Sequence, residues 1–122
     1  MKDGEVRTVY LRDERKFPVA CVANKKENGL LVFAYSAQSP KDEYNRTTAR
    51  NKALGRLAGS HEWYVTEWNE QENMFRKMLR LLTNDDKNSP GYVKSVRVRE
   101  AALLWLRTHP EPNAKPVYRV TV

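Results

Sequence analysis

Apolar runs and polar breaks alternate along the first third of the chain. The runs EVRTVYLR (5–12), FPVACVAN (17–24) and LLVFAYSA (30–37) are rich in β-branched and aromatic residues. Such runs, separated by charged or Asn-Gly breaks, are typical of strands joined by short turns. We predict a three-stranded antiparallel meander in which Asn28 and Gly29 supply the positive φ angles of the second turn. The third run is continuously apolar, which favours a central strand covered on one face and partly on the other.

A helical pattern follows the meander. Ser39 with Asp42 three residues later is a capping signal, and Pro40 suits a first helical turn. Apolar residues at helical spacing continue to Ala58, and Gly59 is typical of a helix end. We therefore predict a first helix that is capped by Ser39 and ends at Gly59.

Less regular patterns follow. The stretch HEWYVTEW (61–68) is aromatic and predicts a short strand or an extended connector. Asn69 and Glu72 form a second capping signal ahead of Met, Phe and Leu residues at helical spacing. We predict that this second helix has glutamates in its first turn and basic residues later, as the helix dipole favours.

The last third is harder to interpret. Val96 and Val98 alternate as in a strand, whereas residues 99–108 have a helical pattern. VYRVTV (117–122) predicts a last strand, which we expect inside or at the edge of the sheet. We predict one α+β domain over residues 1–122. Its antiparallel sheet is the N-terminal meander plus the C-terminal strand, packed against two to three helices on one side.

The composition limits the class of protein. Cys21 is the only cysteine and lies in the second apolar run, so we expect a buried, inert thiol and no internal disulfide. The opening residues lack the apolar segment of a signal peptide, and no run is long enough to span a bilayer. We expect a cytoplasmic protein with no membrane partner.

Positive charge is the strongest pointer to function. Lys and Arg number 22 against 15 Asp and Glu, for a net charge of +7. This excess favours an acidic partner, nucleic acid first. The candidate cations for nucleic-acid or anion contacts are Arg12, Arg15, Lys16, Lys25 and Lys26 in the two meander turns, Arg46, Arg50, Lys52 and Arg56 on the first helix, and Arg97 and Arg99 in the last third.

Each of these clusters allows a second interpretation. Arg46 and Arg50 share a helical stripe with Ala53 and Leu57. Arg46 could simply pair with Asp42 over apolar surface, or both arginines could frame a phosphate or carboxylate pocket. The other clusters could be solvated faces.

The segment that precedes the third helical pattern allows a further interpretation. If residues 92–99 form a strand, Arg97 and Arg99 project from one face and Tyr92 could stack on a base.

Signals of catalysis are weak. His61 and His109 are the only histidines, and His61 lacks the second histidine of a zinc helix. No phosphate-binding glycine loop, nucleophile elbow or Cys–His arrangement is present. The acidic residues between 62 and 72 fit no recognisable metal site. We predict a protein that is not an enzyme, with no catalytic residue, metal or cofactor.

The stretch AYSAQSPKDEYNRTTARNKALGRL resembles a segment of small uncharacterised proteins of bacteriophages and mobile elements. In these proteins a strand is followed by Ser-Pro-Lys-Asp, an aromatic residue and a basic helix that ends in Ala-x-Gly-Arg-Leu. The matching positions are Ser39, Pro40, Lys41, Asp42, Tyr44, Arg46, Arg50, Ala53, Gly55, Arg56 and Leu57. The resemblance implies a small non-enzymatic phage protein that acts in the host cytoplasm.

Two functions remain in competition. The first is nucleic-acid binding, DNA or RNA, through contacts to the backbone. The second is a phage-encoded inhibitor that binds and blocks a host defence protein such as a CRISPR effector, where a basic protein could contact a host nucleoprotein. An enzyme and a structural or assembly role are less favoured. The oligomeric state is left open by the sequence.

Overall fold

The computed structural model describes residues 1–37, 45–59 and 63–111 of the chain. In these ranges, four strands form one open antiparallel sheet in the order β1-β2-β3-β4, and three helices pack on it, which confirms the predicted α+β class. The elements are β1 (Val6–Arg12), β2 (Pro18–Glu27), β3 (Leu30–Ala37), α1 (Arg46–Ala58), β4 (Tyr64–Glu67), α2 (Met74–Leu82) and α3 (Val96–Thr108).

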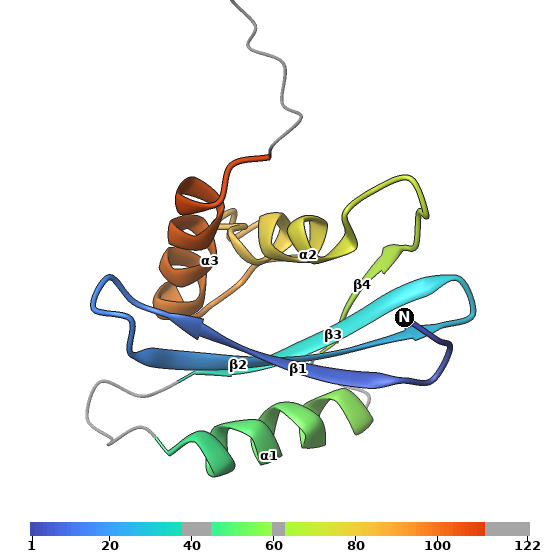
Figure 1. The fold of residues 1–122 in the computed structure, drawn as a ribbon, viewed down its shortest axis with the longest axis horizontal. Coiled ribbons are helices and arrows are strands. Elements are labelled where there is room, and N and C mark those ends of the chain that lie inside the picture. The colour runs from blue at the N-terminus through green and yellow to red at the C-terminus, as the bar shows by residue number, and fades with distance from the viewer. Residues whose placement is uncertain (38–44, 60–62, 112–122) are drawn as a thin grey trace, which may run out of the picture.

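The domain has three layers. The sheet lies in the middle, α1 covers one face, and α2 and α3 cover the other (Figure 1). The prediction that the helices lie on one side was therefore wrong. The reason is visible in β2 and β3, whose apolar runs lack polar alternation and need cover on both faces. In β2, Cys21 packs towards α1, whereas the next residue, Val22, packs towards α2 and α3.

The two apolar cores differ in the size of their side chains. The core under α2 and α3 holds most of the large buried residues, among them Leu11, Phe33, Met78, Leu79 and Leu82. The core under α1 consists mostly of small residues, namely Cys21, Ala23, Ala34, Ala49 and Ala53, together with Val32 and Leu57. Small residues at this contact let the backbone of α1 lie close to the sheet.

The second turn of the meander forms as predicted. Asn28 and Gly29 have φ angles of 52° and 75°. The strand before it is longer than expected, because β2 continues to Glu27. Lys25 and Lys26, which were predicted to lie in the turn, are strand residues opposite Val32 and Leu31 of β3.

The first helix starts later than its capping signal predicted. α1 begins at Arg46, and the side chain of Asn45 accepts a hydrogen bond from the Thr48 amide at 3.0 Å. The backbone of Asn45 is extended, so a helix cannot run through it from Pro40. Ser39 and Asp42 lie outside the described residues. The C-terminal end at Gly59 is confirmed.

The second helix also starts later than predicted. Asn73 caps α2, whereas Asn69 uses its side chain in a local turn with the Gln71 amide. Glu70 and Glu72 consequently precede the helix, and its first turn contains no acidic residue.

The ambiguous segment before the third helix is resolved as helix. Ser95 caps α3, so Val96 and Val98 are helical and not part of a strand. The predicted strand over 117–122 lies outside the described residues. The fourth strand of the sheet is β4, within the stretch predicted as a strand or connector.

Candidate nucleic-acid interface

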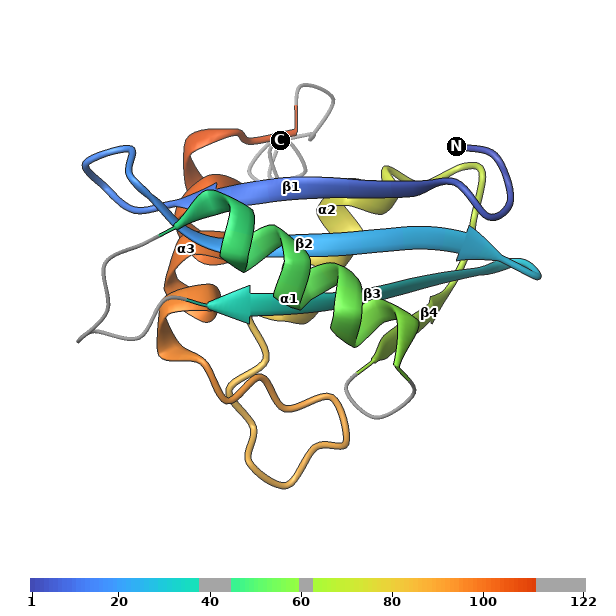
Figure 2. The same cartoon turned by 90° about the horizontal axis from the view of Figure 1, so that it is seen from below.

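The face of the domain that α1 covers, which we call the α1 face, is basic. This 13-residue helix contains Arg46, Arg50, Lys52 and Arg56 and no acidic residue. Its inner residues Ala49, Ala53 and Leu57 are buried against β2 and β3, and the charged residues flank this contact on its two sides. Figure 2 shows α1 crossing the sheet diagonally, from the β1 side at its first residues towards β3 and β4. The basic side chains are thereby distributed along one face of the domain.

Arg46 is anchored at the start of this face. Its guanidinium carbon lies 4.7 Å from the centre of the Tyr10 ring, and the Tyr10 hydroxyl donates a hydrogen bond to the Arg46 carbonyl at 3.2 Å. The cation–π contact holds the guanidinium of Arg46 over β1, and Arg46 as a whole remains exposed to solvent. The proposed ion pair with Asp42 falls outside the described residues.

Arg50 lies near the buried thiol of Cys21 below α1. Burial raises the pKa of Cys21 to about 11, and the positive charge of Arg50 acts in the opposite direction. This confirms the expected buried cysteine. Arg46 and Arg50 do not line either of the two cavities described below, so the anion pocket suggested for them stays a prediction.

Arg56 binds the part of the β3 edge that β4 leaves unpaired. Pairing between β3 and β4 ends at Phe33 opposite Tyr64. Beyond that pair, Nη1 of Arg56 donates a hydrogen bond to the carbonyl of Tyr35 at 2.7 Å. The indole N–H of Trp63 donates in turn to the Arg56 carbonyl at 3.1 Å. The arginine therefore joins α1 to the sheet edge at the point where strand pairing stops.

A cavity of about 380 Å³ lies at this edge, which we call the β3-edge cavity. It brings together residues that are far apart in the sequence. Its aromatic and basic lining consists of Tyr35, Arg56, Trp63, Tyr64, Tyr92 and Lys94. Sequence reasoning had singled out Arg56 and Tyr92 separately, but it missed Tyr35 and Trp63, whose place in the cavity depends on the length of β4.

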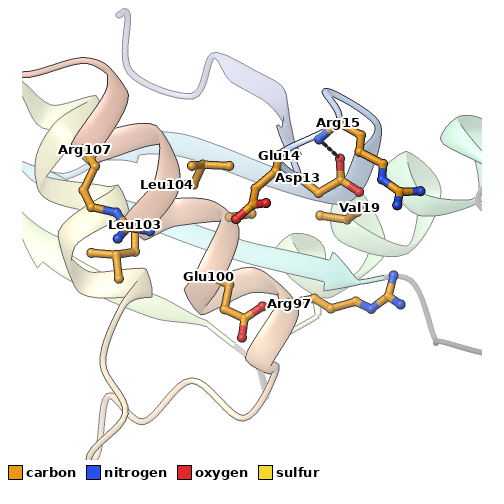
Figure 3. Close-up of a pocket in the computed structure, with 10 residues that line it drawn as sticks. Asp13, Glu14, Arg15, Val19, Arg97, Glu100, Leu103, Leu104 and Arg107 are labelled. Atoms are coloured by element: carbon orange, nitrogen blue, oxygen red, sulfur yellow. Dashed lines mark hydrogen bonds between the residues drawn. The ribbon is translucent and has the colours of Figure 1, made fainter.

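A second cavity, of about 590 Å³, lies between the β1–β2 turn and α3 (Figure 3). We call it the α3 cavity. Arginines, carboxylates and apolar residues line it together, and the apolar residues include Val19 and Leu104. The charged residues are Asp13, Glu14, Arg15, Arg97, Glu100 and Arg107. Equal numbers of acidic and basic groups give no net attraction for phosphate, so this cavity does not strengthen the case for nucleic acid.

The other meander cations are spread over the sheet. Lys25 contacts Glu27 at 3.0 Å and lies over the Trp63 ring. Lys26 contacts Glu70 at 3.1 Å on the α2 side, where the hydrogen bond from Lys26 holds the pKa of Glu70 below its usual range.

The basic residues of the first turn have local roles. Arg12 donates from Nη1 to the Lys16 carbonyl at 3.0 Å, across the β1–β2 turn. Arg15 is exposed in the same turn and lines the α3 cavity. Since Tyr10 of β1 contacts Arg46, this end of the sheet adjoins the start of α1.

Arg97 and Arg99 do not project from one face, because they lie in α3. Two residues apart on a helix, they point about 200° away from each other. Arg97 lines the α3 cavity, and the Arg99 guanidinium lies 5.8 Å from the centre of the Tyr92 ring. The Nε of Arg99 is buried without a hydrogen-bond partner. Arg99 therefore supports Tyr92 from within the fold.

Comparison with family models, with curated proteins and with solved structures finds no match for this chain. The resemblance to phage proteins stays a prediction. Among the described residues, no helix has the length and apolar character needed to cross a bilayer. In the same part of the chain, no three metal-ligating side chains of the His, Cys, Asp or Glu type are grouped as a metal would require.

Proposed function

We propose that this protein binds nucleic acid through the α1 face of the domain, mainly by contacts to the phosphate backbone and without catalysing a reaction. The observation that carries the proposal is the charge of α1. Its four cations share one helix with no acidic residue. Arg46, Arg50 and Lys52 form no ion pair with any acidic side chain in the described ranges.

The spacing of these cations suits a polyanion. Arg46 and Arg56 are ten positions apart on a helix, which corresponds to about 15 Å along its axis. A nucleic-acid backbone presents phosphates over that distance, and each cation that replaces a condensed counterion adds to the affinity.

The experiment compares two triple variants of equal charge. The first is Arg46→Gln, Arg50→Gln and Lys52→Gln. The matched control is Lys2→Gln, Arg80→Gln and Lys87→Gln, which removes three exposed cations elsewhere. Fluorescence anisotropy measures binding to single-stranded DNA, single-stranded RNA and duplex DNA at about 50 mM and about 200 mM salt. Circular dichroism verifies that both variants fold.

With about three phosphate contacts, the wild-type affinity falls about 40-fold for duplex DNA and about 20-fold for the single strands between the two salt concentrations. The α1 variant loses most of this salt dependence, and the control retains it. Equal loss in both variants would contradict a role for α1. Absence of wild-type binding to all three probes at the lower salt would overturn the proposal.

A second function is favoured by the α3 cavity. Its balanced charges and its apolar residues, among them the half-exposed Leu103, suit a protein surface better than a nucleic acid. This is the feature expected of the inhibitor of a host defence protein. Under that alternative the α1 variant keeps its inhibitory activity, whereas a variant such as Leu103→Glu loses it.

A further inference from the structure

The β3-edge cavity has the size of a small-ligand site. Its volume of about 380 Å³ is at the low end of the range of about 300–1,000 Å³ in which ligand pockets fall. Four of its lining residues are aromatic; Trp63 is 39 % exposed, whereas the other three are part-buried. A cavity of this small volume with several aromatic rings suits a single planar group better than a larger, non-planar ligand.

Two of the aromatic side chains of this cavity, Tyr64 and Trp63, are fixed by hydrogen bonds to the backbone. The Tyr64 hydroxyl donates to the Tyr92 carbonyl at 3.1 Å, and the Trp63 indole N–H donates to the Arg56 carbonyl at 3.1 Å. The Tyr64 ring also lies 5.8 Å from the Tyr35 ring. Rings fixed in this way lose little conformational entropy when a ligand stacks on them.

The charges around the rings are positive. Arg56 reaches the cavity from α1 and Lys94 from the segment before α3, and no acidic residue in the described part of the chain lines it. Two further cations contact the rings: Lys25, which is paired with Glu27, lies 5.5 Å from the Trp63 ring centre, and Arg99 lies 5.8 Å from that of Tyr92. The site therefore combines aromatic surface with charges that attract an anion.

We propose that the β3-edge cavity accepts one unpaired base, with its phosphate near Arg56 and Lys94, so that single-stranded nucleic acid is the preferred partner. This inference rests on the proposed function, because Arg56 belongs both to α1 and to the cavity. A strand bound along α1 would thus arrive at the aromatic rings. A base in a duplex is already stacked and paired, and its extrusion costs a few kcal/mol, whereas a single strand avoids that cost.

The test compares a single strand of about 12 nucleotides with a blunt-ended duplex of the same length, both at low salt. The wild type is expected to bind the single strand about tenfold more tightly, since each stacked base contributes strongly to affinity. Stacking on Trp63 is also expected to quench part of the tryptophan fluorescence.

The variant Trp63→Leu with Tyr92→Leu keeps apolar bulk and removes two π faces. It should bind the single strand as weakly as the duplex, with duplex affinity and salt dependence unchanged. The control Phe17→Leu removes an aromatic ring that is 62 % exposed at the β1–β2 turn, and it should change neither affinity.

The outcomes separate the two proposals. Equal wild-type affinity for single strand and duplex, with normal salt dependence, overturns the cavity inference and leaves the α1 function standing. Loss of duplex binding together with single-strand binding in the double variant also overturns it. Absence of binding to both probes overturns the proposed function and this inference together. The wild-type comparison decides the matter even if the double variant does not fold.

Discussion

The two faces of the sheet are built in opposite ways. Under α2 and α3 the core contains large side chains such as Phe33, Leu79 and Leu82, whereas under α1 it contains mainly alanines. Buried apolar area stabilises a fold roughly in proportion to its size. Most of the stability should therefore come from the α2 and α3 face, while α1 is held close by a smaller contact.

The charges differ in the same way. On the α2 side, Lys77 contacts Glu72 at 3.1 Å, and Arg80 contacts Glu111 at 3.6 Å. The cations of that face are thus partly neutralised by glutamates. α1 has cations without acidic residues in its own sequence. The comparison teaches that the face with the weaker core displays the unbalanced charge, which separates the stabilising surface from the proposed binding surface.

The largest effect should come from truncating the larger core. Phe33→Ala removes a fully buried ring that stacks on Tyr64 at 5.5 Å, and it should cost about 3–5 kcal/mol of unfolding free energy. Leu57→Ala, under α1, should cost less, about 2–3 kcal/mol. Urea unfolding followed by tryptophan fluorescence measures both. A greater loss for Leu57→Ala would reverse the comparison.

A second prediction uses the buried thiol below α1. Burial raises the pKa of Cys21 from an ordinary 9.0 to about 11, so the folded state retains the thiol proton more strongly than the unfolded chain. The stabilisation is therefore fully present below about pH 9 and falls by about 1.4 kcal/mol per pH unit until about pH 11.

The measurement is the difference in unfolding free energy between wild type and Cys21→Ala from about pH 8 to about pH 11. Every other residue is the same in the two proteins, so the other contributions to the pH dependence cancel. The difference should shrink as pH rises. A constant difference would mean that the thiol beneath α1 is open to solvent.

The smallest effect concerns a single polar contact between sheet and helix. The buried hydroxyl of Ser36 on β3 donates to the carbonyl of Ala49 on α1. Ser36→Ala should cost about 1 kcal/mol. Thr47→Ala, at an exposed α1 position, serves as control and should stay within about 0.5 kcal/mol. If both variants have the same urea midpoint of unfolding as the wild type, this hydrogen bond does not stabilise the packing of α1 on the sheet.

Sequence reasoning succeeded where a feature depends on neighbouring residues. Strands β1 and β3 lie where the apolar runs predict them, and the turn at Asn28 and Gly29 follows from positive φ angles that few other pairs adopt. It failed where several local signals compete. Asn45 and Asn73 cap the first two helices in place of earlier candidates, because the choice depends on backbone directions set by packing.

The two parts of the candidate site differ in the same way: the charge of α1 follows from the sequence, whereas the β3-edge cavity does not. The absence of acidic residues between Arg46 and Ala58 is a property of the chain itself, so the basic face of α1 was foreseeable as soon as a helix was expected there. The β3-edge cavity was not foreseeable. It exists because β4 pairs with β3 only from Leu30 to Phe33, which leaves an open edge where Arg56 and Trp63 meet Tyr92. Such a meeting depends on the relative lengths of two paired strands, and no single segment encodes that relation.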